Sequence, residues 1–404
     1  MTDDPPASDL PVIRLRPKSK PQAIRHGFPW VFADEAVLDR RTRNIAPGGF
    51  ARLEDAERRP LGLVTVNPNS KIVARVMDAD AEAQIDAGWI AARLAHALEM
   101  RERLYDKPFY RLVHAEADGL PGLVIDRFGD AAVMQPNAAW ADALADEIAE
   151  ALVQVTGVRT VILNGQGRAR GLEGLDERTE VIRGSAPEAP VRVEMNGATY
   201  LADLMGGQKT GLFFDQRPNH AFAQRLVPSG GTVLDVFSHV GGFGLAALAG
   251  GAGRATCVDG SAAALELAKG GAAAMGAAER LEIVQSDAFK ALEALSEDGR
   301  RFDVVICDPP AFAPAKPALE AGLRAYERVA KLAAPLVAPG GYLGLCSCSH
   351  AADLTAFRNV SARGIGRGGR RAQLIHTGQA GPDHPMLPQL AETGYLKALF
   401  FRLD

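Results

Sequence analysis

The segment Asp235-Val-Phe-Ser-His-Val-Gly-Gly-Phe-Gly244 begins inside an apolar run that predicts a strand, residues 232–237, and leads into a stretch that predicts a helix. Strands and helices then alternate to the end of the chain. Further strands are expected at residues 255–258, 281–284, 304–307, 342–346, 373–376 and 396–402. Such alternation predicts an α/β, Rossmann-like domain with a mainly parallel sheet covered on both faces. The last strand follows its predecessor without a clear helix, which favours an antiparallel direction for it.

The glycine turn has the features of a site for a nucleotide-like cofactor. Gly241, Gly242 and Gly244 permit close backbone approach, and the helix that follows offers free N–H groups at its N-terminus. Acidic residues end three successive strands, namely Asp235, Asp259 and Asp287. An acid after the second strand typically binds ribose hydroxyls, and one after the third can meet an adenine amino group. The spacing matches neither GxGxxG nor GxxxxGK[ST], and the alternative interpretation is a tight bend with no ligand.

A second group of residues predicts chemistry at the same sheet edge. Asp308-Pro309-Pro310 follows an apolar strand, and the prolines force the chain to leave the sheet there. Such an acid suits hydrogen bonding to the amino face of a flipped-out base. Cys346 and Cys348 are two residues apart at the end of the next strand, so an extended chain presents them on one face. The alternatives are a structural turn for the acid and buried packing for the thiols.

A cofactor turn, an acid beside prolines and a thiol together favour methyl transfer from S-adenosylmethionine to carbon 5 of cytosine. That carbon becomes nucleophilic when a thiolate adds to carbon 6. Cys346 follows the apolar run that ends at Leu345, so we expect it to be buried and neutral. Cys348 is therefore the expected nucleophile, and Asp308 the residue that orients the base. Cys257 and Cys307 are expected to be core residues.

Composition sets the class of protein. The chain has 404 residues, of which 47% are hydrophobic and 23% charged, with a net charge of −4. Any contact with nucleic acid must therefore come from local basic patches. Two acid-free runs qualify, residues 10–33 and 354–382, although a solvated surface is the alternative interpretation for each. The four cysteines form no zinc motif, so no metal is expected, and they favour a reducing compartment, here the cytoplasm. No apolar run is long enough for a membrane span.

The chain is expected to have four parts. Residues 1–11 are acidic and contain proline, which predicts a disordered tail. Residues 12–78 read as short strands separated by turns, which predicts a small β-barrel. Residues 79–190 are expected to form a middle α+β module that begins with a helix at about residues 83–105. Residues 191–404 form the Rossmann-like domain, which opens with a hairpin that turns on Asn196-Gly197.

These segments resemble the large-subunit rRNA cytosine-C5 methyltransferases that carry an N-terminal PUA domain. The barrel contributes Gly27-Phe-Pro-Trp-Val-Phe32 and Asn67-Pro-Asn-Ser-Lys-Ile72 to the resemblance. The other matching segments are Gly207-Gln-Lys-Thr-Gly211, Asp215-Gln-Arg217, the glycine turn, Asp308-Pro-Pro-Ala-Phe312, Cys346-Ser-Cys-Ser349, Asp383-His-Pro385 and Tyr395-Leu-Lys397. The resemblance spans residues 12 to 403.

The resemblance implies a PUA-like RNA-binding barrel and an S-adenosylmethionine-dependent methyltransferase domain that forms 5-methylcytosine in large-subunit rRNA. It assigns Cys348 as nucleophile and Asp308 as the base-orienting acid. The cofactor site it implies consists of Gln208, Lys209, Asp215, Asp235, Gly241, Gly242, Asp259 and Asp287. His239 and His350 depart from the family pattern, in which Tyr and Gly are usual. An N-methyltransferase for guanine or adenine and a non-catalytic RNA-binding scaffold remain alternatives, and the sequence is compatible with a homodimer.

Overall fold

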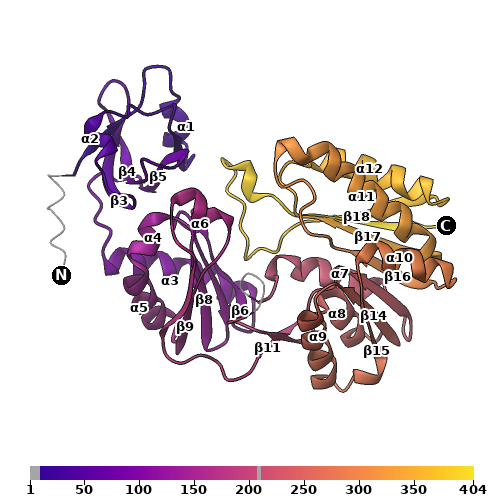
Figure 1. Ribbon diagram of the computed structural model, residues 1–404. Helices are drawn as coiled ribbons and strands as arrows, with labels where there is room; N and C mark the ends of the chain where they lie inside the picture. Colours follow the sequence, from indigo (N-terminus) through magenta and orange to yellow (C-terminus); the bar gives the residue numbers. More distant parts are fainter. Residues whose placement is uncertain (1–9, 207–210) are drawn as a thin grey trace. The chain divides into compact units, whose positions relative to one another are not determined.

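The computed structural model describes residues 10–206 and 211–404 (Figure 1). By their contacts the residues form two units, each described below by itself. The first unit contains the chain up to Pro187 together with Asp383–Thr393. The second unit contains Glu188–Gly207, Gly211–Pro382 and Gly394–Asp404, apart from the undescribed residues. The chain therefore leaves the second unit near its C-terminus, adds a segment to the first, and returns for the last strand.

The first unit begins with a curled five-stranded sheet. Its strands are β1 (Val12–Arg14), β2 (Trp30–Phe32), β3 (Gly49–Glu54), β4 (Pro60–Val66) and β5 (Ile72–Asp78), with the short helices α1 (Pro21–Arg25) and α2 (Arg40–Arg43). The strand order is β1-β3-β4-β5-β2, and only β1 and β3 pair in parallel among these described strands. Ile13, Val31, Leu53, Val64 and Val73 fill its core. The short strands separated by turns that the sequence predicts for residues 12–78 are present.

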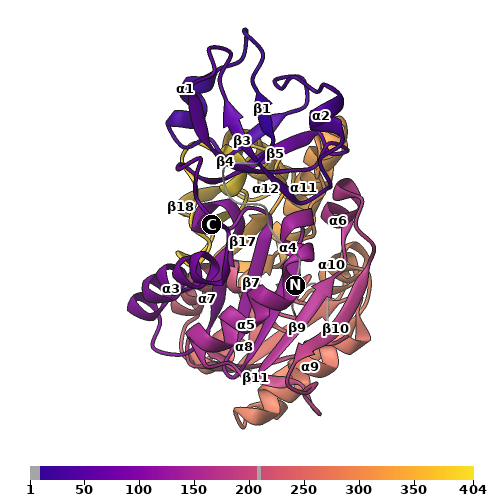
Figure 2. The same ribbon diagram turned by 90° about the vertical axis from the view of Figure 1, so that its left-hand side faces the viewer.

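A second five-stranded sheet follows, in the order β10-β9-β8-β7-β6 (Figure 2). Its strands are β6 (Phe109–His114), β7 (Leu123–Phe128), β8 (Ala131–Pro136), β9 (Thr160–Gly165) and β10 (Arg178–Arg183), and its helices are α3 (Ala87–Leu104), α4 (Ala139–Ala143), α5 (Ala145–Thr156) and α6 (Arg168–Glu173), with the 3-10 turn η2 (Ala115–Asp118). Ile90 and Leu94 of α3 pack with Trp140, Ile148 and the strands in one core. The helical stretch between β8 and β9 is divided at Leu144 into α4 and α5.

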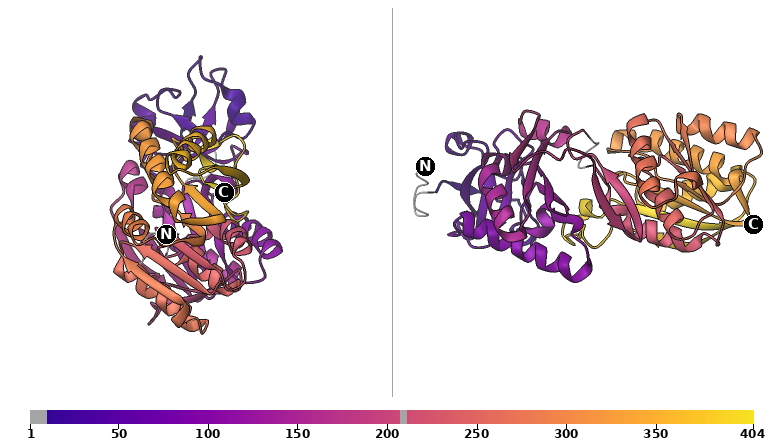
Figure 3. Two further views of the ribbon diagram at one scale, coloured as in Figure 1. Left: turned by 90° about the vertical axis from the view of Figure 1, so that its right-hand side faces the viewer. Right: turned by 90° about the horizontal axis from the view of Figure 1, so that it is seen from below.

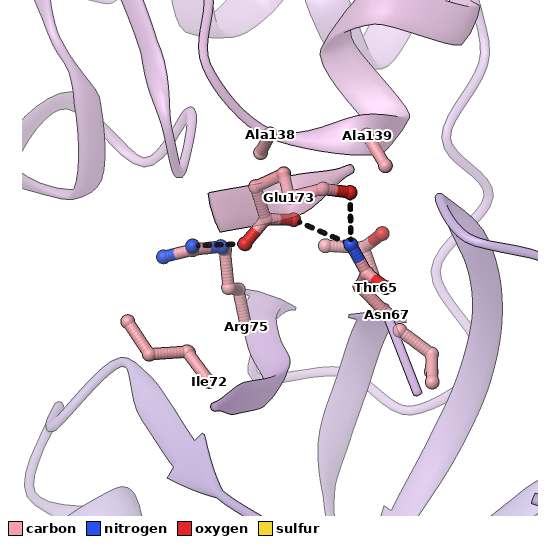
Figure 4. A pocket seen from close by; sticks show the side chains of 8 residues that line it. Thr65, Asn67, Ile72, Arg75, Ala138, Ala139 and Glu173 are labelled. Carbon is pink, nitrogen blue, oxygen red and sulfur yellow. Dashed lines mark hydrogen bonds and ion pairs between the residues drawn. The ribbon is translucent and has the colours of Figure 1, made fainter. Parts of the chain in front are cut away.

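Glu173 joins the two sheets of the first unit (Figure 4). Its carboxylate accepts hydrogen bonds from Asn67 at 2.9 Å, from Ser70 at 2.9 Å and from Arg75 at 2.8 Å. Because all three donors lie in β5 or in the turn between β4 and β5, a single buried acid holds this part of the curled sheet. The adjoining cavity of about 10 Å³ has room for about one water molecule.

A buried arginine anchors Asp383–Thr393 within the same unit. Arg101 of α3 is fully buried, and its two terminal nitrogens donate to Asp118 at 2.6 and 2.8 Å. The same guanidinium donates to the backbone oxygens of Arg111 and Asp383, both at 2.9 Å. The Asp383 carboxylate in turn accepts a bond from the Arg111 backbone N–H at 3.0 Å. Helix, strand and returning segment are therefore joined by one charged group.

The second unit is built on a seven-stranded sheet in the order β15-β14-β13-β16-β17-β19-β18. These strands are β13 (Thr232–Val236), β14 (Arg254–Asp259), β15 (Leu281–Gln285), β16 (Phe302–Cys307), β17 (Val337–Ser347), β18 (Ala372–Gly378) and β19 (Lys397–Leu403). The pairs from β15 to β17 are parallel, whereas β19 is antiparallel to both of its neighbours. The order reverses between β13 and β16, which is where such sheets bind ligands. The predicted α/β, Rossmann-like class and the antiparallel last strand are confirmed.

Helices cover both faces of this sheet (Figure 3). They are α7 (Arg217–Leu226), α8 (Gly242–Ala249), α9 (Ala262–Ala274), α10 (Ala288–Glu297), α11 (Leu319–Ala333) and α12 (Leu354–Arg367). The 3-10 turns of this unit are η3 (Phe214–Gln216), η4 (Ala278–Arg280), η5 (Lys316–Ala318) and η6 (Ala334–Leu336). A further 3-10 turn, η7 (Ala391–Thr393), lies in the segment that belongs to the first unit. The predicted hairpin is present as β11 (Val191–Met195) and β12 (Ala198–Ala202), with Asn196 and Gly197 both at positive φ. In the part of the chain that is described, no helix has the length and apolar character needed to cross a membrane.

Replacing Arg101 tests the anchoring of the first unit. Arg101→Met leaves Asp118 and two carbonyl oxygens buried without their donor, so the free energy of unfolding should fall by about 3–5 kcal/mol. Arg103→Met on the same helix is the control, because the exposed Arg103–Glu99 pair should contribute about 0.5 kcal/mol or less. Urea unfolding of the two variants measures the difference. Equal stabilities would contradict the role given to Arg101.

Candidate active site

The turn between β13 and α8 has an unusual backbone. Phe237 and His239 lie at φ +63° and +49°, and Gly241 follows at +81°. Non-glycine residues in this region are uncommon and cluster at functional sites, where the surrounding structure holds them. Position 244 requires glycine for a different reason, because a Cβ there would lie 2.6 Å from the Cys257 sulfur. It allows α8 to pack closely on β14.

Asp235 ties this turn to the start of α8. One carboxylate oxygen accepts from the backbone N–H groups of Phe243 at 3.1 Å and Gly244 at 2.8 Å. The other oxygen is buried and has no hydrogen-bond partner. Burial raises the pKa of Asp235 to about 7. A buried acceptor without a donor, at a glycine turn of strained backbone, is what a site built for a polar ligand contains.

The acids after the next two strands have local partners in the structure. Asp259 accepts from the backbone N–H of His239 and that of Ser261, both at 2.8 Å, so it braces the turn. Asp287 is exposed and caps α10 by accepting from the Lys290 N–H at 3.1 Å. Helix capping alone accounts for an acid at position 287. Binding of the cofactor by these two side chains therefore stays a prediction.

Asp215 lies in the turn before α7, and most of its surface is buried. Its Oδ2 accepts from the Tyr395 hydroxyl at 2.6 Å, whereas its Oδ1 has no partner. His220 of α7 lies against the glycine turn, since a Cβ at Gly242 would be 2.8 Å from its Nε2. Its Nδ1 is also buried without a partner. Gln208 and Lys209, the other two residues expected before the sheet, lie outside the described residues.

Asp308 directly follows β16 and is held from two sides. Its backbone N–H donates to the oxygen of Val236 at 3.1 Å, which ties it to the end of β13. Its Oδ2 accepts from Gln216 Nε2 at 2.9 Å. The orientation of that amide is fixed, because Gln216 Oε1 accepts from Asn219 at 2.7 Å. The Asp308 carboxylate thus has a defined orientation at the carboxyl end of the sheet.

The two neighbouring thiols differ as the sequence predicted. Cys346 is 1% exposed, and burial together with the nearby Asp308 charge raises its pKa well above the ordinary value. Cys348 is partly exposed, one residue beyond the end of β17. Cys257 and Cys307 are fully buried, and burial raises the pKa of both thiols, as expected for core residues. Cys348 is therefore the accessible thiol of the four.

A hydroxyl network supports the loop that carries Cys348. The Tyr326 hydroxyl of α11 lies 2.9 Å from Ser347 Oγ and 2.7 Å from Ser349 Oγ. Ser349 Oγ also accepts from the Ala313 N–H at 2.9 Å, just after the Asp308-Pro309-Pro310 turn. The loop after Asp308 and the loop that carries Cys348 are therefore bonded to each other and to one helix.

Both basic runs are partly neutralised within their own units. In residues 10–33, Arg14 pairs with Glu54 at 3.0 Å and Arg25 with Asp55 at 2.8 Å. In residues 354–382, Arg363 and Arg367 both pair with Glu327, and Arg370 pairs with Asp404. Only part of the charge in these runs is thus available to a phosphate backbone. That either of these two runs contacts RNA stays a prediction.

Comparisons with known proteins show the family of the chain. Residues 148–402 match the family model for S-adenosylmethionine-dependent methyltransferases, and residues 13–79 match the model for a PUA-like domain. The chain belongs to this methyltransferase family. The ribosomal RNA large subunit methyltransferase I of Aeromonas salmonicida is 35% identical over 95% of this chain and 98% of its own length. The protein of the same name from Vibrio cholerae is 34% identical, over 94% and 96%.

Solved structures confirm the fold of the methyltransferase. A Streptococcus mutans protein, described as a SAM-dependent methyltransferase, superposes with a TM-score of 0.80 and covers 97% of this chain and 100% of its own, at 19% identity. The protein SMU.776, solved with SAH, gives 0.81 over 97% and 99%, also at 19% identity. The family models and the 35% identical relative confirm the family resemblance, the enzymatic class and S-adenosylmethionine as cofactor. The orphaned atoms of Asp215, His220 and Asp235 fit a polar cofactor at this turn.

Sequence reasoning missed three residues of the site. Gln216 stands next to the predicted Asp215, so the sequence could have pointed to it. No sequence pattern marks Asn219 or Tyr326 as a site residue, since each looks like an ordinary polar residue of an amphipathic helix. In the described part of the site, no three His, Cys, Asp or Glu side chains are grouped so as to hold a metal ion.

The raised pKa of Asp235 predicts a pH dependence of stability without cofactor. The pKa rises from 3.8 to about 7 on folding, so the stabilising contribution is complete below pH 3.8 and is lost as the pH rises through about 7. Asp235→Asn imitates the protonated acid. Relative to this variant, the wild-type free energy of unfolding should fall by about 3 kcal/mol between pH 5 and pH 8. Urea unfolding at the two pH values measures it, and a constant difference would contradict the assignment.

Proposed function

We propose that the methyltransferase transfers a methyl group to carbon 5 of a cytosine in large-subunit ribosomal RNA. The names of the relatives supply the class of RNA. The choice of atom rests on the position of Cys348. This partly exposed thiol lies just beyond β17, and β17 pairs with β16, the strand that Asp308 directly follows. Methylation of an exocyclic nitrogen needs no such thiol, whereas carbon 5 of cytosine needs covalent activation.

Cys348 acts as the nucleophile in this proposal. Its thiolate forms a bond to carbon 6 of the cytosine, and the electron pair moves so that carbon 5 becomes nucleophilic. When bound, S-adenosylmethionine supplies the methyl group that carbon 5 takes up. Loss of the proton from carbon 5 and breaking of the sulfur–carbon 6 bond then restore the thiolate and the aromatic base. Cys346 is too deeply buried to share this role and packs behind it.

Asp308 orients the base. Gln216 holds its Oδ2, and the carboxylate accepts from the cytosine amino group, a contact that uracil cannot provide. Asp235, Gly241, Gly242 and Asp259 hold the cofactor at the turn after β13. Asp215 and Asp287 are further contacts in the proposal, together with Gln208 and Lys209.

The remaining assignments follow from the substrate. The PUA-like sheet is the RNA-binding module, and ribosomal RNA as substrate supports a cytoplasmic location. Arg16, Lys18 and Lys20 are exposed members of its basic run and are its expected phosphate contacts. A homodimer stays a hypothesis, which sedimentation of the purified protein tests.

Trapping with 5-fluorocytosine tests the mechanism. RNA carrying this base should form a stable covalent complex with the wild type in the presence of S-adenosylmethionine, because fluorine at carbon 5 blocks the final elimination. The complex should survive Cys346→Ser and be absent in Cys348→Ser. Denaturing electrophoresis and peptide mass spectrometry identify the linked residue. A complex that survives both changes would falsify the thiol mechanism and favour methylation of a ring or exocyclic nitrogen.

A further inference from the structure

A lysine is buried beneath the turn that follows Cys348. Lys397 is the first residue of β19, pairs with Ser347 of β17 in the antiparallel register, and is 8% exposed. Its ammonium donates to the backbone oxygen of Ser349 at 2.7 Å and to that of Ala352 at 2.8 Å. Two carbonyl groups hydrogen-bond the charge but do not neutralise it. Burial of a charge is costly unless a charge of opposite sign compensates it.

Cys348 is the group that can supply the opposite charge. Burial lowers the pKa of Lys397, and the negative charges of Cys348 and Asp353 raise it, with Cys348 the stronger of the two. Such an interaction is reciprocal, because the energy by which a thiolate favours the ammonium also favours the thiolate. Asp353 is exposed and already caps α12 by accepting from the Ala356 N–H at 2.7 Å.

Three other titratable groups among the described residues lie around the loop. Tyr326 of α11 faces the loop as a neutral phenol, since burial raises its pKa. Asp308 at the end of β16 is an acid that raises the pKa of Cys346 and Cys307. His350, two residues after Cys348, is exposed, and its ring lies 5.6 Å from that of Tyr395.

We infer that Lys397 is a positioning residue of the methyl transfer, whose buried ammonium holds the Cys348 loop and keeps Cys348 ionised near neutral pH. The inference rests on the proposed role of Cys348 as nucleophile. It answers the chemical requirement that a free thiol, with an ordinary pKa of roughly 8.5, be ionised before it can add to carbon 6. Lys397 reaches the reacting atoms only through Cys348 and its loop.

Alkylation of Cys348 tests the inference without RNA or cofactor. In a Cys346→Ser background, the rate of modification by iodoacetamide is measured across pH 5.5 to 9.5, and peptide mass spectrometry confirms the site. The wild-type midpoint should lie below roughly 8.5. Lys397→Gln keeps amide donors for the two carbonyls but removes the charge, and should shift the midpoint upward by about one pH unit, which slows alkylation at pH 7 about tenfold. Lys397→Arg should restore most of the shift.

Tyr326→Phe is the matched control, because it removes two hydroxyl contacts of the same loop and no charge. Its midpoint should stay that of the wild type even where its rate changes. An unchanged midpoint in folded Lys397→Gln, or an equal shift in Tyr326→Phe, overturns the inference. Should Lys397→Gln fail to fold, a wild-type midpoint at or above roughly 8.5 overturns it alone. Absence of the 5-fluorocytosine complex in the wild type would instead refute the proposed function, whatever the midpoint of alkylation.

Discussion

The parallel pairing of β13, β16 and β17 is the constraint on which the site depends. Because these three strands run side by side in one direction, the glycine turn, Asp308 and Cys348 all lie at the carboxyl ends of the strands. A backbone hydrogen bond from the Asp308 N–H to the oxygen of Val236 fixes the position of Asp308 relative to the glycine turn. No single segment of the sequence contains the site, and the register of the sheet assembles it.

Side chains from elements outside these strand ends then set the fine geometry. Gln216, oriented by Asn219, fixes the carboxylate of Asp308, and Tyr326 bonds the loop that carries Cys348 to the loop after Asp308. These contacts are hydrogen bonds between buried polar groups, so each partner is costly to remove. The proposed reaction, which needs a thiol, a base and a methyl donor held at fixed positions, benefits from such a rigid support.

The sequence predicted the strands of the curled sheet and of the seven-stranded sheet, because alternating or continuous apolar runs specify them locally. It also separated Cys346 from Cys348 correctly, since the apolar run before Cys346 predicts burial. Gln216 and Tyr326 were missed because their partners lie 92, and 21 or 23, residues away, which no local pattern encodes. Asp287 shows the converse case, where an acid at a strand end also serves as an ordinary helix cap.

The central claim is that the product is 5-methylcytosine in large-subunit ribosomal RNA. The direct measurement uses ribosomal RNA from cells that lack this protein, incubated with the purified enzyme and isotopically labelled S-adenosylmethionine, followed by nucleoside mass spectrometry. The account predicts labelled 5-methylcytidine in the large-subunit RNA, and none with Cys348→Ser. Label in a methylated guanosine or adenosine, or label in cytidine that persists in Cys348→Ser, would contradict it.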